Sequence, residues 1–366
     1  MADTFYIGLT NSEVFLTAAA ITLPAFMFLS AIANLFGVGG ASLIARSLGV
    51  QNREKAKNIS SFSIILCIIT TIIYSLFSFL FLDEFINLLG GVNTEVHFYA
   101  AEYMKIAIII GGVFTLLSMV LSHLIRAEGK SLDASIGIIL GGILNIIFDP
   151  LFMFVILDEG NEVLGTTIAT CLSNFIACIY YFLLIKYKYK KTAYICLRFD
   201  KTIFSDEIPK DVISVGLPAC VMTTFENISY GVLENLVASY GIMYQAGLGV
   251  AKKTNMLSHN CVRGLTQGVL PLLAYNYSSK NNKRMNSILN ATLLIAIIFS
   301  SLWLATNFIF SNELVSIFLH TENSTKLLAI KFLKTLCIGC PFSACTYTFV
   351  SYFQAVGKGK ISFISF

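Results

Sequence analysis

The chain has 366 residues, of which 56% are hydrophobic and only 13% are charged, and its mean hydropathy is +0.76. A soluble globular chain carries about 25% charged residues, so this chain has too little ionised surface to stay in solution. These values exclude a soluble enzyme and a nucleic-acid-binding protein, and they indicate an integral membrane protein. The net charge of +4 is small, so its distribution along the chain is more informative than its size.

Apolar stretches of membrane-spanning length, about 20 helical residues, follow one another along the whole chain. A final stretch begins at Gly359, and the complete ones lie near residues 14–45, 57–82, 98–125, 132–157, 163–186, 208–240, 244–274, 286–311 and 326–354. Glycine and proline inside them are compatible with helix, because neighbouring helices satisfy the backbone groups that these residues free. We therefore expect an all-α integral membrane fold.

Basic residues are concentrated in alternate loops. The loops after the first, third, fifth, seventh and ninth stretches hold most of the 25 Lys and Arg residues, whereas the loops between them are acidic or neutral. Because basic residues remain on the cytoplasmic side of a membrane, we place these five loops in the cytoplasm. The segment that precedes the first stretch then begins on the outer side.

An internal repeat relates two parts of the chain at an offset of about 229 residues, the kind of internal repeat that many transporters contain. Residues 39–59 align with residues 268–288, and AEGK at 127–130 aligns with AVGK at 355–358. One repeat unit therefore contains six spans, and an even number gives both halves the same orientation in the membrane.

The repeat predicts two six-helix lobes related by a pseudo-two-fold axis. They comprise residues 1–187 and 208–366, and residues 188–207 form a cytoplasmic linker. Counted by this unit, the first lobe lacks most of its first helix and the second lacks its last two helices. We therefore expect twelve spans in the intact protein, with Met1 as an internal methionine or a fragment edge.

The nine cysteines lie mostly in apolar stretches, so we interpret them as reduced packing residues. Cys337 and Cys340 form a CxxC pair, but no second ligand pair at metal-binding spacing accompanies them. Helix packing is therefore the simpler explanation of this motif.

Asp149 is the clearest ionisable residue at membrane depth, where a charge costs about 2.5 to 3.5 kcal/mol on insertion scales. Asn145 lies one helical turn before it. Pro150 follows, and because proline has no N–H, the carbonyl of Ile146 lacks its helical donor. Carboxylate, amide and carbonyl oxygens on one turn suit Na⁺ or a proton relay. A network of hydrogen bonds between helices is the alternative.

Asp3 is a second acid assigned to the same lobe. By the repeat, the segment MADTFYIG at the start of the chain ends a helix whose counterpart is the stretch at 208–240. Thr167 and Thr170 on the fifth stretch add hydroxyl oxygens. Without the preceding helix, Asp3 would be interpreted as an exposed terminal residue.

The seventh stretch is unusually polar and contains Lys252, Lys253, His259 and Arg263. Charges at this depth require water or a partner, and Glu226 or Glu234 of the preceding stretch is expected to pair with Lys252 or Lys253. Lining of a substrate cavity is the alternative, for which the candidates are Glu226, Glu234 and Lys253. Glu234 also fits an outer-end position near lipid headgroups.

The sequence contains no phosphate-binding P-loop, HExxH or GxSxG motif. We therefore expect no enzymatic activity, and no cofactor other than a coupling ion.

Six motifs occur in the order typical of one transporter family. They are ADTFYIG at 2–8, GVGGASLIARSLGVQNREKA at 37–56, RAEGK at 126–130, LNIIFDPLF at 144–152, GLTQGVLPLLAYNY at 264–277 and QAVGKGK at 354–360. Over essentially its whole length the chain resembles the multidrug and toxic compound extrusion (MATE) family.

The resemblance implies two six-helix lobes in a V around a cavity that opens alternately to each side of a bacterial plasma membrane. It implies a multi-pass, monomeric protein that exports amphipathic organic cations, such as drugs or metabolites, by antiport with Na⁺ or H⁺. Carried over by position, the cation site of the family falls on Asp3, Asn145, Asp149 and Thr167. Once an ion or proton neutralises the acids, the helix is expected to bend at Pro150 or an adjacent glycine.

The second lobe departs from the pattern of the family. Glu226 matches a carboxylate that one branch of the family carries, but that branch places an aspartate where Ser343 stands here. This difference favours coupling through the first lobe. The alternative function is a flippase or exporter of a lipid-linked or amphipathic anion on a related fold, which Lys252, Lys253 and Arg263 support.

Overall fold

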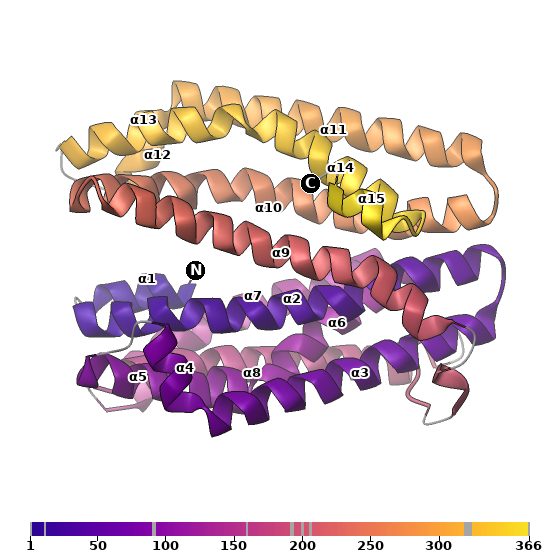
Figure 1. Cartoon of the computed structure of the whole chain (residues 1–366), viewed down its shortest axis with the longest axis horizontal. Coiled ribbons are helices and arrows are strands. Elements are labelled where there is room, and N and C mark those ends of the chain that lie inside the picture. Colours follow the sequence, from indigo (N-terminus) through magenta and orange to yellow (C-terminus); the bar gives the residue numbers. More distant parts are fainter. Residues whose placement is uncertain are drawn as a thin grey trace. The chain divides into compact units, whose positions relative to one another are not determined.

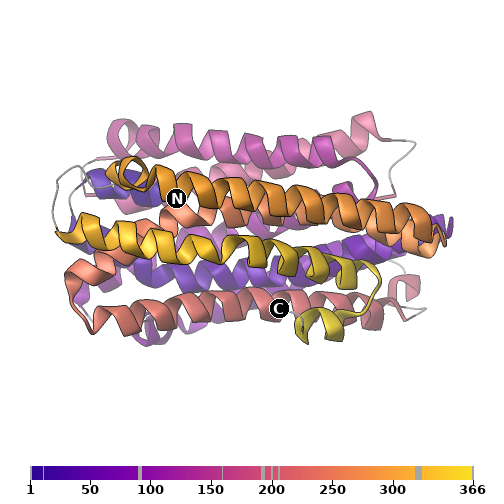
Figure 2. The same ribbon diagram turned by 90° about the horizontal axis from the view of Figure 1, so that it is seen from above.

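The computed structural model describes residues 2–10, 12–89, 93–158, 160–190, 194–198, 201–204, 207–317 and 324–364. Within these residues all regular secondary structure is helical and no strand occurs. The long helices of each part run side by side (Figure 1 and Figure 2). The expected all-α fold is confirmed.

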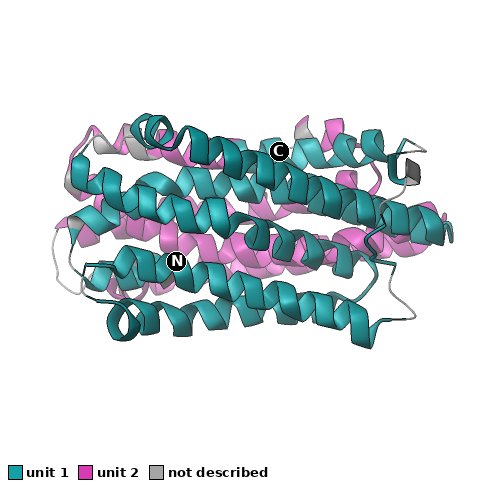
Figure 3. Cartoon of the chain, turned by 90° about the horizontal axis from the view of Figure 1, so that it is seen from below, with its two compact units in different colours: residues 1–224 teal, residues 225–366 magenta. Residues whose placement is uncertain are grey.

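The chain divides into two compact units, Met1–Thr224 and Phe225–Phe366, which Figure 3 shows in different colours. The boundary falls inside one helix, α9. The predicted lobe boundaries at residues 187 and 208 remain a prediction.

The first unit contains eight α-helices, three short π-helical segments, one 3₁₀ turn and the first part of α9 in its described residues. They are α1 (Ala2–Leu9), α2 (Glu13–Gly49), α3 (Arg53–Leu80), α4 (Leu82–Leu88), α5 (Thr94–Met104), η1 (Lys105–Ile110), α6 (Gly112–Ala127), α7 (Ser131–Leu151), η2 (Phe152–Ile156), α8 (Glu162–Leu183), η3 (Leu184–Lys188), η4 (Lys201–Phe204) and α9 (Ile208–Ala238).

The second unit contains the rest of α9 and six further helices in its described residues. They are α10 (Ile242–Ser278), α11 (Asn282–Ile309), α12 (Ser311–Ser316), α13 (Ser324–Ile338), α14 (Cys340–Ala355) and α15 (Gly359–Ile364).

All nine predicted spans are helical, although not all are straight. Among the described residues, six helices are long and apolar enough to cross a membrane by themselves. Two more spans are bent pairs, by 48° between η1 and α6 and by 41° between α13 and α14. The remaining span, α10, is 37 residues long and is more polar than the others, because it contains Lys252, Lys253, His259 and Arg263.

Small residues pack inside the first unit, and large apolar residues cover its outside. Ala33 and Ala45 on α2 and Ser60 on α3 are fully buried, whereas Ile73 on α3 and Ile147 on α7 are more than half exposed. Small residues let helix backbones approach closely where lipid, not water, surrounds the protein. This distribution is what a bilayer environment requires.

The internal repeat appears in the local backbone of the two units. Gln51 and Lys280 both have a positive φ, of 60° and 58°. The residues that follow them, Asn52 and Asn281, cap α3 and α11 by accepting a hydrogen bond from the N–H three residues on, at 3.0 and 3.1 Å. Such caps satisfy N–H groups at the start of a helix. The two turns are 229 residues apart, in agreement with the offset from the sequence.

The second aligned segment shows the same agreement. Gly129 and Gly357 both have a left-handed backbone, with φ of 82° and 78°, a conformation that glycine adopts at little cost. Each donates its N–H to the carbonyl three residues earlier, at 3.0 and 3.2 Å. Aligned residues of the two units therefore form the same turns.

Residues 194–198 of the predicted linker are attached to the first unit. The buried carboxylate of Glu128 accepts hydrogen bonds from the backbone N–H groups of Tyr194 and Ile195, both at 2.7 Å. Arg198 pairs with Glu54 at 2.8 Å. The linker is therefore held against the ends of α3 and α6.

The nine cysteines are all free thiols, as expected. Cys337 and Cys340 of the CxxC pair are buried, and no group of His, Cys, Asp or Glu in the described residues could hold a metal ion.

Candidate functional site

Two carboxylates of the first unit are joined by a chain of hydrogen bonds. Asn145 donates through Nδ2 to Asp149 Oδ1 at 3.2 Å and to Thr170 Oγ1 at 3.0 Å. Thr170 Oγ1 donates in turn to Asp3 Oδ2 at 3.0 Å. Asp3 lies on α1, Asn145 and Asp149 on α7, and Thr170 on α8, so three helices contribute to one cluster.

Asp149 is the least compensated member of this cluster. Its side chain is 0% exposed, and its Oδ2 atom is buried with no hydrogen-bond partner. Among the described residues, no Lys, Arg or His forms an ion pair with Asp149 or Asp3. A buried charge without a partner is strongly destabilising. The cluster therefore suits a cation or a proton, either of which would offset the buried charge of Asp149.

The carbonyl group that Pro150 leaves without a helical donor has found another partner. The hydroxyl of Tyr6 on α1 donates to the carbonyl oxygen of Ile146 at 3.3 Å. Directly after Pro150, α7 ends at Leu151 and continues as the π-helix η2. Local departures from α-helical hydrogen bonding of this kind often occur at functional sites. A hinge at Pro150 remains a prediction.

The two threonines of α8 differ in their contacts. Thr167 is fully buried and donates its hydroxyl to the carbonyl oxygen of Val163 in its own helix, at 2.6 Å, whereas Thr170 joins the two acids. Tyr103 on α5 lies close enough to both acids to interact with them electrostatically, and no sequence motif pointed to it. The roles of Asp3, Asn145, Asp149 and Thr167 in cation binding remain predictions.

Glu226 in the second unit is paired with side chains of α10 and α14. It forms an ion pair with Arg263 of α10 and accepts a hydrogen bond from the hydroxyl of Tyr347 on α14, at 3.2 Å through Oε1. Arg263 also donates to the Tyr347 hydroxyl, at 3.2 Å. Glu226 therefore pairs with Arg263, which α10 turns toward α9 at this level. The other expected pairing, of Glu234 with Lys252 or Lys253, involves a side chain outside the described residues.

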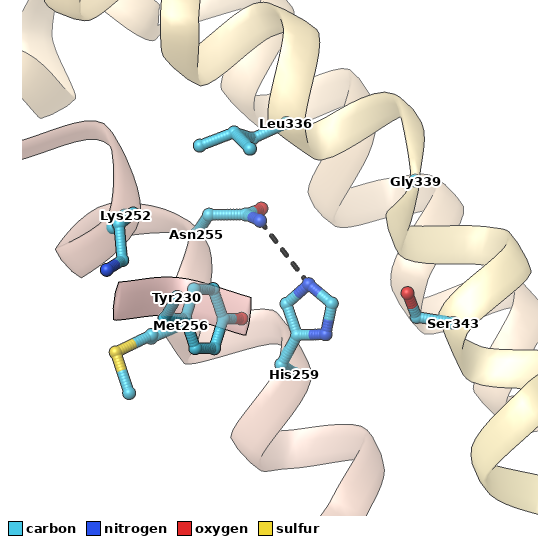
Figure 4. A pocket seen from close by; sticks show the side chains of 8 residues that line it. All are labelled: Tyr230, Lys252, Asn255, Met256, His259, Leu336, Gly339 and Ser343. Atoms are coloured by element: carbon cyan, nitrogen blue, oxygen red, sulfur yellow. Dashed lines mark hydrogen bonds between the residues drawn. The ribbon is translucent and has the colours of Figure 1, made fainter. Parts of the chain in front are cut away.

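A cavity of about 220 Å³ lies next to this ion pair in the second unit. Figure 4 shows its lining side chains, which are Tyr230, Lys252, Asn255, Met256, His259, Leu336, Gly339 and Ser343. Asn255 and His259 are hydrogen-bonded at 3.3 Å. Lys253 is exposed and is not among the lining residues, and the side chain of Glu234 lies outside the described residues.

A family model described as MatE matches residues 1–151 and 218–366, which is most of the chain. The chain belongs to the MatE family. Two curated MatE relatives are the multidrug export proteins MepA of Staphylococcus haemolyticus and of Staphylococcus aureus strain MRSA252. Each is 28% identical over 97% of this chain, and the matched regions cover 76% and 77% of those proteins.

Solved structures agree with this assignment. A crystal structure of MATE in complex with MaD3S has a TM-score of 0.90 at 25% identity, and the match covers 99% of this chain and 79% of that chain. An outward-facing multidrug resistance MATE family transporter has the same fold, with a TM-score of 0.91 at 24% identity and the same coverage. This MatE protein is therefore a multi-pass protein of the bacterial plasma membrane, in a family of multidrug efflux transporters.

Proposed function

We propose that this chain exports amphipathic drugs, organic cations among them, in exchange for Na⁺ or H⁺, and that the coupling ion binds at the acidic cluster of the first unit. The observation that supports the proposal most directly is the buried, unpartnered Oδ2 of Asp149. Family membership supports efflux, whereas the coupling depends on this cluster.

The cluster provides the chemistry that a coupling ion needs. Asp149 and Asp3 together supply two carboxylates, and the side chains of Asn145 and Thr170 between them supply neutral oxygens. Oxygen atoms are the ligands that hard cations prefer. A proton would be held by the same carboxylates, because two acids in a poorly solvated site do not both remain ionised without a counter-charge.

Antiport requires that the coupling ion and the drug are not bound together. A bound ion offsets one negative charge of the Asp149 and Asp3 pair, which weakens the attraction that holds an organic cation in the first unit. A hydrogen bond from Tyr6 to the carbonyl of Ile146 joins α1 to α7 beside Pro150. The bound ion also changes the relative stability of the conformations that these two helices adopt. A ligand shifts such a balance only through its different affinity for the two conformations.

The second unit is less suited to coupling. The carboxylate of Glu226 is already engaged by Arg263 and Tyr347, and Ser343 replaces a possible second acid. The same ion pair weakens the alternative of an anionic substrate, because Arg263 is neutralised by Glu226.

Exchange in proteoliposomes tests this proposal. The protein is reconstituted with a fluorescent organic cation inside the vesicles, and Na⁺ and proton gradients are imposed in separate experiments. We expect release of the dye with one of the two ions and none without a gradient. Release that is independent of both gradients would contradict antiport.

A further inference from the structure

A basic segment follows the lipid-facing part of α8. Phe175, Ile179 and Phe182 recur at helical spacing on this helix and are exposed, as apolar residues that face lipid are in a membrane-spanning helix. Residues 186–191 then read KYKYKK, which places four lysines directly after the span. This end of α8 leads into one of the loops assigned to the cytoplasm, so the lysines lie at the level of the cytoplasmic lipid headgroups.

Part of this segment is fastened to the first unit. Lys188 donates from Nζ to both carboxylate oxygens of Asp133, at 2.9 and 3.1 Å, and the hydroxyl of Tyr189 donates to the same buried carboxylate. The ammonium group of Lys130 lies 3.7 Å from the centroid of the Tyr189 ring. The chain reaches this anchor through the π-helical turn η3, a departure from α-helical hydrogen bonding that is frequent at functional sites. These contacts hold the segment in a defined orientation.

The remaining side chains of the segment are not engaged in this way. Lys186, Tyr187 and Lys190 are exposed, and the ammonium group of Lys186 lies 5.4 Å from the centroid of the Tyr187 ring. Neither Lys186 nor Lys190 forms an ion pair among the described residues, whereas the neighbouring Lys188 is neutralised by Asp133. The fold therefore presents two positive charges next to the lipid-facing surface of α8.

An anionic phospholipid matches this surface in both charge and polarity. Lysine side chains near the end of a membrane-spanning helix extend their ammonium groups to the headgroup level, where a lipid phosphate can pair with them. Tyr187, which is 69% exposed, is a residue type that membrane interfaces favour. The exposed Phe182 and Leu183 offer apolar surface to the acyl chains. A soluble phosphate ion would gain the same charge attraction but no apolar contact, so the surface favours a lipid.

We propose that Lys186, Tyr187 and Lys190 form a binding site for the headgroup of an anionic phospholipid of the cytoplasmic leaflet. The proposal goes beyond drug export and does not depend on it, because it requires only a protein that spans a membrane. α8 also carries Thr170, which joins the two acids of the first unit. The lipid therefore binds at the cytoplasmic end of a helix that contributes to the acidic cluster.

Quenching of tryptophan fluorescence by brominated lipids tests this site. The chain contains one tryptophan, Trp303, so Tyr187→Trp in a Trp303→Phe background places a single reporter at the site and keeps an aromatic ring there. The protein is reconstituted in phosphatidylcholine vesicles that contain a rising fraction of dibrominated phosphatidylglycerol or, in a parallel series, of dibrominated phosphatidylcholine. We expect phosphatidylglycerol to bind beside the reporter about 5- to 30-fold more tightly, since each basic residue near an anionic lipid contributes about fivefold.

Substitutions in this reporter protein identify the lysines that bind the lipid. Lys186→Gln and Lys190→Gln should each lower the preference for phosphatidylglycerol about fivefold, and the double variant should show little preference. Lys283→Gln is the matched control, because Lys283 is an exposed lysine of α11 in the second unit and forms no ion pair among the described residues. It should leave the preference unchanged. Equal quenching by the two lipids in the reporter protein, a double variant that keeps the preference, or an equal loss in the control would overturn the proposal.

A measurement without the reporter keeps the test decisive if the tryptophan variants do not fold. The melting temperature of the wild-type protein in detergent is measured with added phosphatidylglycerol, phosphatidylcholine or inorganic phosphate at constant ionic strength. We expect phosphatidylglycerol to raise it most, and the double variant of Lys186→Gln and Lys190→Gln to lose that difference. Equal stabilisation by both lipids, an unchanged difference in the double variant, or the same stabilisation by inorganic phosphate would overturn the assignment to a lipid. Because no ion gradient is used, this experiment can succeed while the antiport experiment fails.

Discussion

Replacement of Asp149 by Asn removes one negative charge from the acidic cluster and changes its shape little. The side chain is fully buried, so water does not screen the charge that is lost. The hydrogen bond from Asn145 goes to Oδ1, and the oxygen of the new amide can still accept it. The substitution therefore separates the charge of Asp149 from its packing.

The expected size of the effect follows from Coulomb's law. Two unit charges about 4 Å apart interact by roughly 4 kcal/mol at the effective dielectric constant of about 20 that suits protein sites. Loss of one carboxylate should therefore weaken binding of Na⁺ or a proton about a thousandfold. A ligand at about 100 times its dissociation constant stabilises the folded state by about 2.7 kcal/mol, and the variant should lose nearly all of that stabilisation.

Thermal denaturation of the detergent-solubilised full-length protein measures this effect. The melting temperature is followed as Na⁺ replaces K⁺ at constant ionic strength, and again as the pH is lowered. We expect the wild-type protein to be stabilised by one of the two ions and Asp149→Asn to be stabilised by neither. Without either ion the variant should be at least as stable as wild type, because repulsion between the two acids is relieved.

The matched control is Asp158→Asn, the same substitution at an exposed residue after η2. It should keep the response of the wild-type protein. Two results would show that this carboxylate does not bind the coupling ion. One is a wild-type melting temperature that neither ion changes, and the other is an Asp149→Asn variant whose melting temperature changes as in the wild type.

Three further predictions concern other contacts. Thr170→Val removes the hydroxyl that joins Asn145 to Asp3. It should weaken binding of the coupling ion about 10- to 100-fold, the equivalent of one hydrogen bond to a charged group. An unchanged ion dependence of the melting temperature would contradict this role. Gly216→Ala would place a methyl group against a backbone carbonyl oxygen of α2 and should lower stability by about 1 to 3 kcal/mol in thermal denaturation, whereas Gly264→Ala, with open space around it, should not. Glu128→Ala leaves two backbone N–H groups of the linker without an acceptor, so trypsin should cleave the variant faster within residues 186–201. Cleavage at the wild-type rate would show that this carboxylate does not hold the linker.

Properties that depend on residues close in the chain were predictable from the sequence. The pairing of Asn145 with Asp149 is an example, because residues four apart meet on one face of any α-helix. The turns at Gln51 and Lys280 are another, since each depends on a few consecutive residues. The helical spans follow from apolar stretches long enough to cross a bilayer.

Contacts between helices were less predictable. Thr167 and Thr170 lie on nearly the same face of α8, and a small rotation of that helix decides which hydroxyl reaches Asn145. The partner of Glu226 depends on helix packing in a similar way. Lys252 and Arg263 both lie on α10, and the level at which α10 meets α9 selects the arginine.

The sequence by itself determined the helices, their order, their caps and the polar residues that each carries, because these depend on neighbours within about one helical turn. Only the tertiary structure decided that Tyr6 covers the carbonyl of Ile146, that Thr170 joins the two acids and that Lys252 lies over Tyr230. Such choices depend on the rotation and the relative level of packed helices. The rotation and level of two packed helices are set by many side chains on their contacting faces, so no local sequence pattern specifies them.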